Sequence, residues 1–197
     1  MSHHKIHSTL NPLPLGPGSG KILLFSHVYP SPVGPIYFLV TRTGGVFRSG
    51  FSDRVFQQDP QKYTIEPNKY ACGEVAFQLD QYFHSDRKTF ELELVTDLGT
   101  QFQQDVWNRL LKIDFGQTMT YGEIAQKVGR RFAARAVGNA VGKNPLPIFV
   151  PCHRVLPASG KVGKYSADGL SSEQQVSLKQ SLLKLEWKRA GNAQKLK

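Results

Sequence analysis

Cysteine is scarce in this chain of 197 residues, which contains only Cys72 and Cys152. Two cysteines exclude a disulfide framework and a four-cysteine zinc site, and they favour a reducing compartment. Long apolar runs are also missing: none could span a bilayer, and Met1 to Lys5 lacks the apolar stretch of a secretory signal. We therefore expect no membrane association and an intracellular place of action, either bacterial cytoplasm or eukaryotic nucleus.

Acidic residues are scarce in the second half of the chain. Residues 1–97 carry 9 Lys and Arg against 9 Asp and Glu, whereas residues 98–197 carry 16 against 6. The whole net charge of +10 therefore lies in the second half, which predicts a polyanionic partner there. A solvated basic face without a partner is the alternative.

Signatures of cofactor binding are missing as well. The sequence has no phosphate-cradling loop, nucleotide-binding fingerprint or metal cluster, so we expect no cofactor and no metal. His3, His4 and His7 lie in a stretch rich in Pro, Gly and Ser, without a cysteine or carboxylate nearby. That composition is typical of a solvated tail rather than a metal site, and residues 1–20 are predicted to form a flexible arm.

Residues 21–97 predict a small α/β domain without an evident chemical motif, which we interpret as a scaffold. Its expected elements are a strand over Lys21 to Val28, a hairpin of Pro35 to Val40 and Val46 to Phe51 around Thr43-Gly44-Gly45, a helix over Glu74 to Phe83, and a half-buried strand over Phe90 to Leu94.

Residues 98–190 predict a mostly helical domain, followed by a tail over residues 191–197. Its expected elements are a helix with the apolar stripe Phe102, Val106, Trp107, Leu110 and Leu111, a helix over Tyr121 to Val128 that opens with a Thr120–Glu123 capping box, and a helix over Ala133 to Gly142.

The last two of these helices are joined by a turn, Gly129 to Phe132, and so have the form of a helix-turn-helix. Alanine and glycine leave the second helix almost bare, with Arg135 as its only large projecting side chain. Such helices often pack tightly against other helices. The surrounding basic residues favour close approach to nucleic acid instead.

The run Pro151 to Val155 places the Cys152 thiol beside the His153 imidazole, after an apolar stretch, Leu146 to Val150, that predicts a strand. A thiolate is the attacking form of cysteine, and a nearby base makes it available near neutral pH. Neighbours on a strand point to opposite faces, however, so adjacency alone does not pair the two groups. A buried, inert cysteine is the alternative.

Residues 99–170 contain an ordered series of motifs. They are Gly99-Thr100-x-Phe102-Gln103-x-x-Val106-Trp107, Thr120-Tyr121-Gly122-x-Ile124-Ala125, Ala134-Arg135-Ala136-Val137-Gly138-x-Ala140, Asn144-Pro145-x-Pro147-Ile148, Pro151-Cys152-His153-Arg154-Val155, and Gly160 through Gly163 to Tyr165-Ser166. In this order and with these spacings, the segment resembles the O6-alkylguanine-DNA alkyltransferases, also called methylated-DNA:protein-cysteine methyltransferases.

The resemblance implies both a fold and an activity. The fold is a ribonuclease H-like α/β N-terminal domain plus a mostly α C-terminal domain with a helix-turn-helix and an active-site cysteine loop. The activity is DNA repair, in which the alkyl group of O6-alkylguanine in double-stranded DNA moves irreversibly to Cys152, once per molecule and without a cofactor. O4-alkylthymine is a further candidate substrate. We expect a monomer in solution, with clustering on DNA left open.

The resemblance also implies catalytic roles. Cys152 is the alkyl acceptor, His153 removes the thiol proton through a water, and Glu186 orients the imidazole. Asn144 binds the same water and fixes the turn before the cysteine. Tyr121 donates a proton or hydrogen bond to the leaving purine, and the thiol must lie exposed beside a cavity that admits the base.

Guanine is selected, by the same resemblance, through the carbonyls of Cys152 and Val155 and the backbone NH of Ser166, with Tyr165 and Pro147 also at the pocket. The base has to rotate out of the duplex, and Arg135 fills the space that it leaves. The helix is implied to enter the minor groove. The expected DNA contacts are Thr120, Tyr121, Arg130, Arg131, Ala133, Ala134, Arg135, Ala136, Gly138 and Lys143.

Two departures and two alternatives accompany the resemblance. Some family members hold zinc in the N-terminal domain through cysteines and histidines, whereas this chain has only Cys72 there. Ala167-Asp168-Gly169 stands where the family usually has paired glycines, which changes the pocket rim. The alternatives are a non-catalytic lesion-recognition protein of the same fold and a cysteine hydrolase.

Overall fold

The chain divides into two compact units, Met1–Asp97 and Leu98–Lys197. A computed structural model describes residues 20–95, 99–165 and 167–192. The predicted arm over residues 1–20 and tail over residues 191–197 therefore lie largely outside the described residues. No helix in the described ranges has the length and apolar character needed to cross a membrane.

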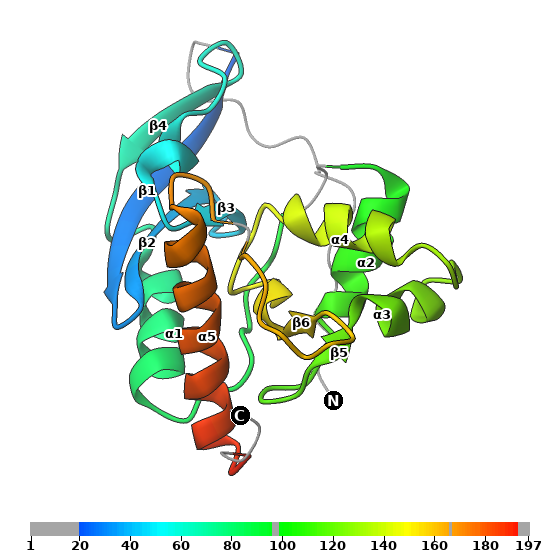
Figure 1. Ribbon diagram of the computed structural model, residues 1–197. Coiled ribbons are helices and arrows are strands. Elements are labelled where there is room, and N and C mark those ends of the chain that lie inside the picture. The colour runs from blue at the N-terminus through cyan, green and yellow to red at the C-terminus, as the bar shows by residue number, and fades with distance from the viewer. Residues whose placement is uncertain (1–19, 96–98, 166, 193–197) are drawn as a thin grey trace. The chain divides into compact units, whose positions relative to one another are not determined.

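The first unit is built on a four-stranded mixed sheet in the order β3-β2-β1-β4 (Figure 1). Its elements are β1 (Ile22–Ser31), β2 (Gly34–Thr41), β3 (Val46–Gly50), the 3-10 turn η1 (Asp53–Phe56), β4 (Tyr63–Pro67) and α1 (Gly73–His84). Strands β1, β2 and β3 form an antiparallel meander, while β4 runs parallel to β1. The predicted first strand, hairpin and helix are confirmed, and β4 was missed.

One prediction in this unit is wrong: Phe90 to Leu94 is not a strand. The burial of its side chains alternates as expected, but only Leu94 forms an isolated bridge, to Val46. Upstream, the Gln78 side chain accepts from the Glu91 NH at 2.8 Å and donates to the Glu91 carbonyl at 3.2 Å. A side chain from α1 thus takes the backbone groups that a neighbouring strand would have used.

The second unit is mostly helical and carries one short parallel strand pair, β5 with β6 (Figure 1). Its elements are α2 (Gln101–Leu110), β5 (Met119–Thr120), α3 (Tyr121–Lys127), α4 (Ala134–Gly142), the 3-10 turn η2 (Cys152–Arg154), β6 (Val155–Leu156) and α5 (Ser172–Arg189). Capping boxes start α2 at Thr100 and α3 at Thr120. The second confirms the helix start predicted at Thr120, and the first was not predicted.

Helix α4 is anchored to α2 by apolar packing and by one buried hydrogen bond. Val137, Ala140 and Val141 form its buried face, and the Trp107 indole NH donates to the Ala140 carbonyl at 2.9 Å. A buried indole NH needs such a partner, so this bond fixes where α4 sits on α2. The opposite side of α4 faces solvent.

The predicted strand over Leu146 to Val150 is also wrong, because this apolar run forms a tight turn. The Val150 NH bonds back to the Leu146 carbonyl at 2.8 Å, and Ile148 has a φ of 77°. A β-branched residue seldom adopts that left-handed conformation, so the turn must be held by its surroundings. Asn144 supplies this support through hydrogen bonds to the Val150 carbonyl and the Leu146 NH.

Candidate active site

Cys152 opens the 3-10 turn η2, between the tight turn and β6. Its NH bonds to the Val150 carbonyl at 2.8 Å. Because Cys152 and His153 lie on a turn and not on a strand, the expectation that their side chains point to opposite faces does not apply.

Asn144 ties the tight turn to the sulfur atom. Its amide nitrogen donates to the Val150 carbonyl at 2.8 Å and to Cys152 Sγ at 3.0 Å. Its amide oxygen accepts from the Leu146 NH at 3.0 Å. One buried side chain therefore holds both ends of the turn and directs a hydrogen-bond donor at the sulfur.

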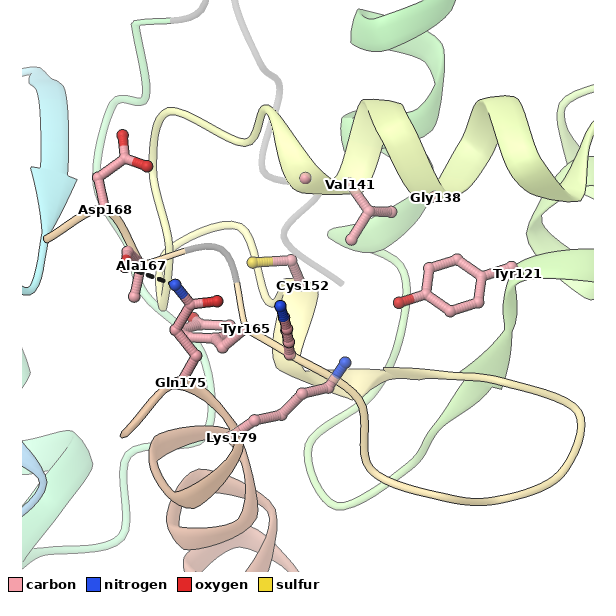
Figure 2. Close-up of a pocket in the computed structure, with 11 residues that line it drawn as sticks. Tyr121, Gly138, Val141, Cys152, Tyr165, Ala167, Asp168, Gln175 and Lys179 are labelled. Carbon is pink, nitrogen blue, oxygen red and sulfur yellow. Dashed lines mark hydrogen bonds between the residues drawn. The ribbon is translucent and has the colours of Figure 1, made fainter. Parts of the chain in front are cut away.

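The thiol is not exposed as the sequence predicted, because Cys152 keeps only 1% of its surface accessible. It nevertheless borders a cavity of about 280 Å³, close to the ~300 Å³ at which small-molecule pockets begin. Figure 2 shows the Tyr121 hydroxyl pointing toward Cys152 across this space. The lining residues are Tyr121, Gly138, Val141, Gly142, Cys152, Lys164, Tyr165, Ala167, Asp168, Gln175 and Lys179.

Burial raises the pKa of Cys152, while hydrogen bonds from Asn144 and Tyr165 and the charge of Lys179 oppose that rise. The free protein therefore holds a thiol that is surrounded by groups able to stabilise a thiolate. Burial, with a smaller effect of Cys152, also raises the pKa of Tyr121. The Tyr121 hydroxyl accordingly keeps its proton at neutral pH and can act as a donor.

A buried network of charged groups lies directly after the cysteine. His153 Nε2 is 2.8 Å from Glu186 Oε1, and the Arg154 guanidinium bonds to the same carboxylate at 2.8 to 3.1 Å. The Gly116 NH donates to Glu186 Oε2 at 3.1 Å, and Arg154 also donates to the Ile113 carbonyl at 2.6 Å. These contacts hold the imidazole in one orientation.

The network fixes the charge of each member. Burial lowers the pKa of His153 and outweighs the opposing effect of Glu186, so the imidazole is neutral. Burial alone would raise the pKa of Glu186, but contacts with His153 and Arg154 prevail and hold it below its usual range. Because a carboxylate can only accept, Nε2 carries the imidazole proton and Nδ1 is free to accept one. Within the described residues Nδ1 has no hydrogen-bond partner.

Lys179 is a site residue that the sequence reading missed. Its side chain is buried, its ammonium donates to the Val155 carbonyl at 2.6 Å, and burial lowers its pKa to about 8. The available signal was the buried face of α5, where Lys179 and Glu186 share a helical stripe with Leu182 and Leu183. Charged side chains are almost never fully buried unless they are paired, so charged residues at core positions of a helix indicate a specific role.

Gln175, also missed, holds the rim of the cavity. Its amide nitrogen donates to the carbonyls of Ala167 at 3.3 Å and Leu170 at 3.1 Å, and Figure 2 shows the first of these bonds. The segment that departs from the family pattern is therefore fastened to α5.

The remaining predicted site residues fall into four groups. Tyr165 and Gly138 line the cavity, whereas Pro147 and Val155 are buried without being among the described lining residues. Ser166 lies outside the described residues. The fourth group surrounds α3 and α4. Two of its members, Ala133 and Thr120, are half-buried. The others are exposed: Arg130, Arg131, Ala134, Arg135, Ala136 and Lys143.

Comparison with known proteins places this unit in a class. Residues 101–188 match the family described as 6-O-methylguanine DNA methyltransferase, DNA binding domain. The matched segment includes α2 to α5 and the turn that carries Cys152.

Relatives of known function match more of the chain. The methylated-DNA–protein-cysteine methyltransferase of Methanosarcina acetivorans is 38% identical over 163 residues, which cover 83% of this chain and 98% of that protein. The enzyme of the same name from Mycobacterium bovis is 41% identical, covering 81% and 90%. This chain belongs to the methylated-DNA–protein-cysteine methyltransferase family.

Solved structures agree with this assignment. The crystal structure of Mycobacterium tuberculosis O6-methylguanine methyltransferase has a TM-score of 0.70 at 34% identity, covering 84% of this chain and 94% of that one. The crystal structure of Mycobacterium tuberculosis OGT in complex with DNA has a TM-score of 0.71 at 36% identity, covering 87% and 98%.

Proposed function

We propose that this protein repairs DNA by transferring the alkyl group of O6-alkylguanine to Cys152, once per molecule. The observation that carries the proposal is a cysteine sulfur at the wall of a cavity, with a neutral histidine held by a buried carboxylate next to it. The sulfur attacks the alkyl carbon, a carbon–sulfur bond forms, and the bond from carbon to O6 breaks. The thioether product offers no leaving group for a second cycle.

His153 is the proposed base. Its Nε2 proton is held on Glu186, so the lone pair of Nδ1 is available, and a buried Nδ1 without a described protein partner is a group that a bridging water would satisfy. That water would take the thiol proton and pass it to Nδ1, in the manner of a nucleophile activated by an oriented base. Asn144 and Lys179 would then stabilise the sulfur anion that Cys152 acquires.

Tyr121 is the proposed donor to the departing guanine. Its raised pKa keeps the hydroxyl protonated, and Figure 2 shows this hydroxyl pointing toward Cys152 across the cavity. A proton or hydrogen bond to the purine ring lets the base leave without a full negative charge.

Backbone groups would select guanine, with the carbonyls of Cys152 and Val155 accepting from the exocyclic amine and the Ser166 NH meeting O6. Lys179 already donates to the Val155 carbonyl. A carbonyl oxygen has two lone pairs, so it can accept a second donor. Tyr165, buried at the cavity, and Pro147, in the tight turn, would shape the site.

DNA is the proposed partner of the second unit. Helices α3 and α4 would act as a helix-turn-helix whose bare face, with Ala134, Ala136 and Gly138, enters the minor groove. Arg135 would occupy the place of the rotated nucleotide, because a base inside the stack cannot reach a buried sulfur. The expected phosphate and groove contacts are Thr120, Tyr121, Arg130, Arg131, Ala133 and Lys143.

The first unit would be a ribonuclease H-like scaffold, and the protein would act as a monomer, with clustering along DNA left open. Its place of action would be the compartment that holds the genome, bacterial cytoplasm or eukaryotic nucleus. O4-alkylthymine is a further candidate substrate.

The test is mass spectrometry after incubation with a duplex that contains O6-methylguanine. We expect one added methyl group on the Cys152 peptide and no more than one equivalent per protein. The Cys152→Ala variant should bind the duplex without accepting the group. Cys72→Ala is the matched control and should still accept it, because Cys72 is buried at the start of α1 with a pKa raised to about 11.

Two outcomes would contradict the proposal. Multiple turnovers would favour a cysteine hydrolase, and binding without a mass shift would favour a protein that recognises lesions without repairing them.

A further inference from the structure

The turn between α3 and α4 exposes an aromatic ring that no step above uses. Phe132 is 101% exposed, more than any other large apolar side chain of the described residues. Tyr70 and Phe77 follow at 85% and 56%, both in the first unit. An aromatic side chain gains most from burial, so a ring held fully in water suggests a partner that covers it.

The surroundings of Phe132 indicate which partner that is. The two residues before it, Arg130 and Arg131, are exposed cations, and Arg135 is exposed three residues after it. In the described residues from 127 to 143 there is no acidic side chain to balance them. This pattern of charge complements a polyanion, and it disfavours a purely apolar protein surface as the partner.

The residues that follow Phe132 have small side chains that leave the ring accessible. Ala133 precedes α4, and Ala134 and Ala136 on its exposed side carry only methyl groups. Phe132 and Arg135 are thus the bulky groups at the start of a helix that is otherwise bare. A ring in this position can reach past the charged phosphates to the less polar parts of a nucleic acid.

We propose that the Phe132 ring is an apolar DNA contact, which packs against sugar and base faces in the groove while Arg130 and Arg131 pair with phosphates. The inference rests on the proposed function, because it takes DNA as the partner of α3 and α4. Proteins that bind the minor groove often insert apolar wedges at base steps. Contact with a base face tolerates any sequence, since every base has one.

The salt dependence of DNA binding distinguishes the contribution of the Phe132 ring from those of its charged neighbours. Phe132→Ala should weaken binding to a short duplex about tenfold, the loss typical of a removed aromatic contact. The slope of log K against log salt should not change, because an apolar contact releases no counterions. Arg131→Gln should instead lower that slope by about one. Phe77→Ala, the matched control, removes a partly exposed phenylalanine from α1 and should leave DNA affinity unchanged.

A tryptophan at the same position gives a direct readout. The two natural tryptophans, Trp107 and Trp187, are 2% and 3% exposed and therefore shielded from solvent. In Phe132→Trp the new indole should emit as a solvent-exposed group, and saturating DNA should quench it by stacking or groove contact. The unfolding temperatures of the Phe132 variants should equal that of the wild type, because the ring packs against no buried group.

Three results on single-copy duplexes would overturn the inference. They are unchanged affinity of Phe132→Ala, a changed salt slope in that variant, or an indole in Phe132→Trp that stays accessible to iodide in the complex. A loss confined to cooperative binding on long DNA, with normal affinity for a duplex that holds one copy, would also overturn it by making the ring a contact between copies. If the wild type fails to accept methyl from DNA, that result contradicts the proposed function, independently of the results for the Phe132 variants.

Discussion

Replacing Glu186 by Gln should destabilise the protein strongly, although the amide has nearly the same shape. The carboxylate is fully buried and holds His153, Arg154 and the Gly116 NH. Gln removes the negative charge, so the Arg154 guanidinium stays buried without a counter-charge. Removing one partner of a buried ion pair costs about 3–5 kcal/mol. At about 2–4 °C per kcal/mol for a chain of this size, Tm should fall by roughly 6–20 °C.

The assay is thermal unfolding at neutral pH, with Glu173→Gln as the matched control. Glu173 is an exposed carboxylate in the first turn of the same helix, and its substitution should leave Tm nearly unchanged. In Glu186→Gln the rate of methyl transfer should also fall, by about 10²–10⁴-fold if the oriented base is lost. A Tm equal to that of the control would refute the claim that Arg154 depends on this carboxylate.

The difference in unfolding free energy between wild type and Glu186→Gln should change with pH in one direction. The pKa of Glu186 is lower in the folded protein than in the unfolded chain. The stability that Glu186 contributes is therefore complete above the ordinary glutamate pKa of about 4.3, and is lost as pH falls toward the folded value. The gap in unfolding free energy between wild type and Glu186→Gln should shrink only in acid.

Three further substitutions test other parts of the second unit. The pKa of Lys179 is about 8 in the folded protein, below the usual 10.5. The unfolding free energy of the wild type, measured relative to that of Lys179→Met, should therefore rise by about 3 kcal/mol between pH 8 and 10.5. Gly116→Ala should cost about 2–3 kcal/mol in urea unfolding, since its φ is 73° and a Cβ would overlap Ala190. Gly160→Ala, with the same φ but open space, should cost less. Asn144→Ala should slow methyl transfer and lower Tm by removing hydrogen bonds to the turn and to the sulfur.

Local sequence signals predicted the elements whose cause is local. The stripe of Val106, Trp107 and Leu110 identified α2, and the Thr120–Glu123 pair placed the start of α3 at the observed residue. A capping box is made within four residues, so the sequence contains all of its parts.

Elements that depend on distant partners could not be predicted in the same way. The run from Leu146 to Val150 has the composition of a strand, but the Asn144 side chain closes it into a turn. Phe90 to Leu94 has the alternation of a strand, but Gln78 on α1 takes the backbone NH and carbonyl of Glu91. Periodicity reports which side chains are buried, and does not report which partner satisfies the backbone.

The site was predictable only in part for a related reason. Resemblance to the family pointed to Cys152, His153 and Glu186. In the structure the His153 imidazole lies 2.8 Å from Glu186, and Cys152 lines a cavity. Lys179 and the role of Arg154 were missed, because a charged residue in a helix is normally taken as solvent-facing. The spacing of Lys179 and Glu186 with Leu182 and Leu183 was the available signal, and the three-dimensional packing shows that this face of α5 is buried.

The burial of Cys152 affects how long an unreacted protein molecule keeps its capacity to accept an alkyl group. A protein that accepts one alkyl group is spent when any other electrophile or oxidant arrives first. With 1% of its surface accessible and its thiol kept protonated by burial, Cys152 presents little target to small reagents in solution. The low reactivity of the buried thiol in the free protein would thus contribute to selectivity for the lesion before the protein binds DNA.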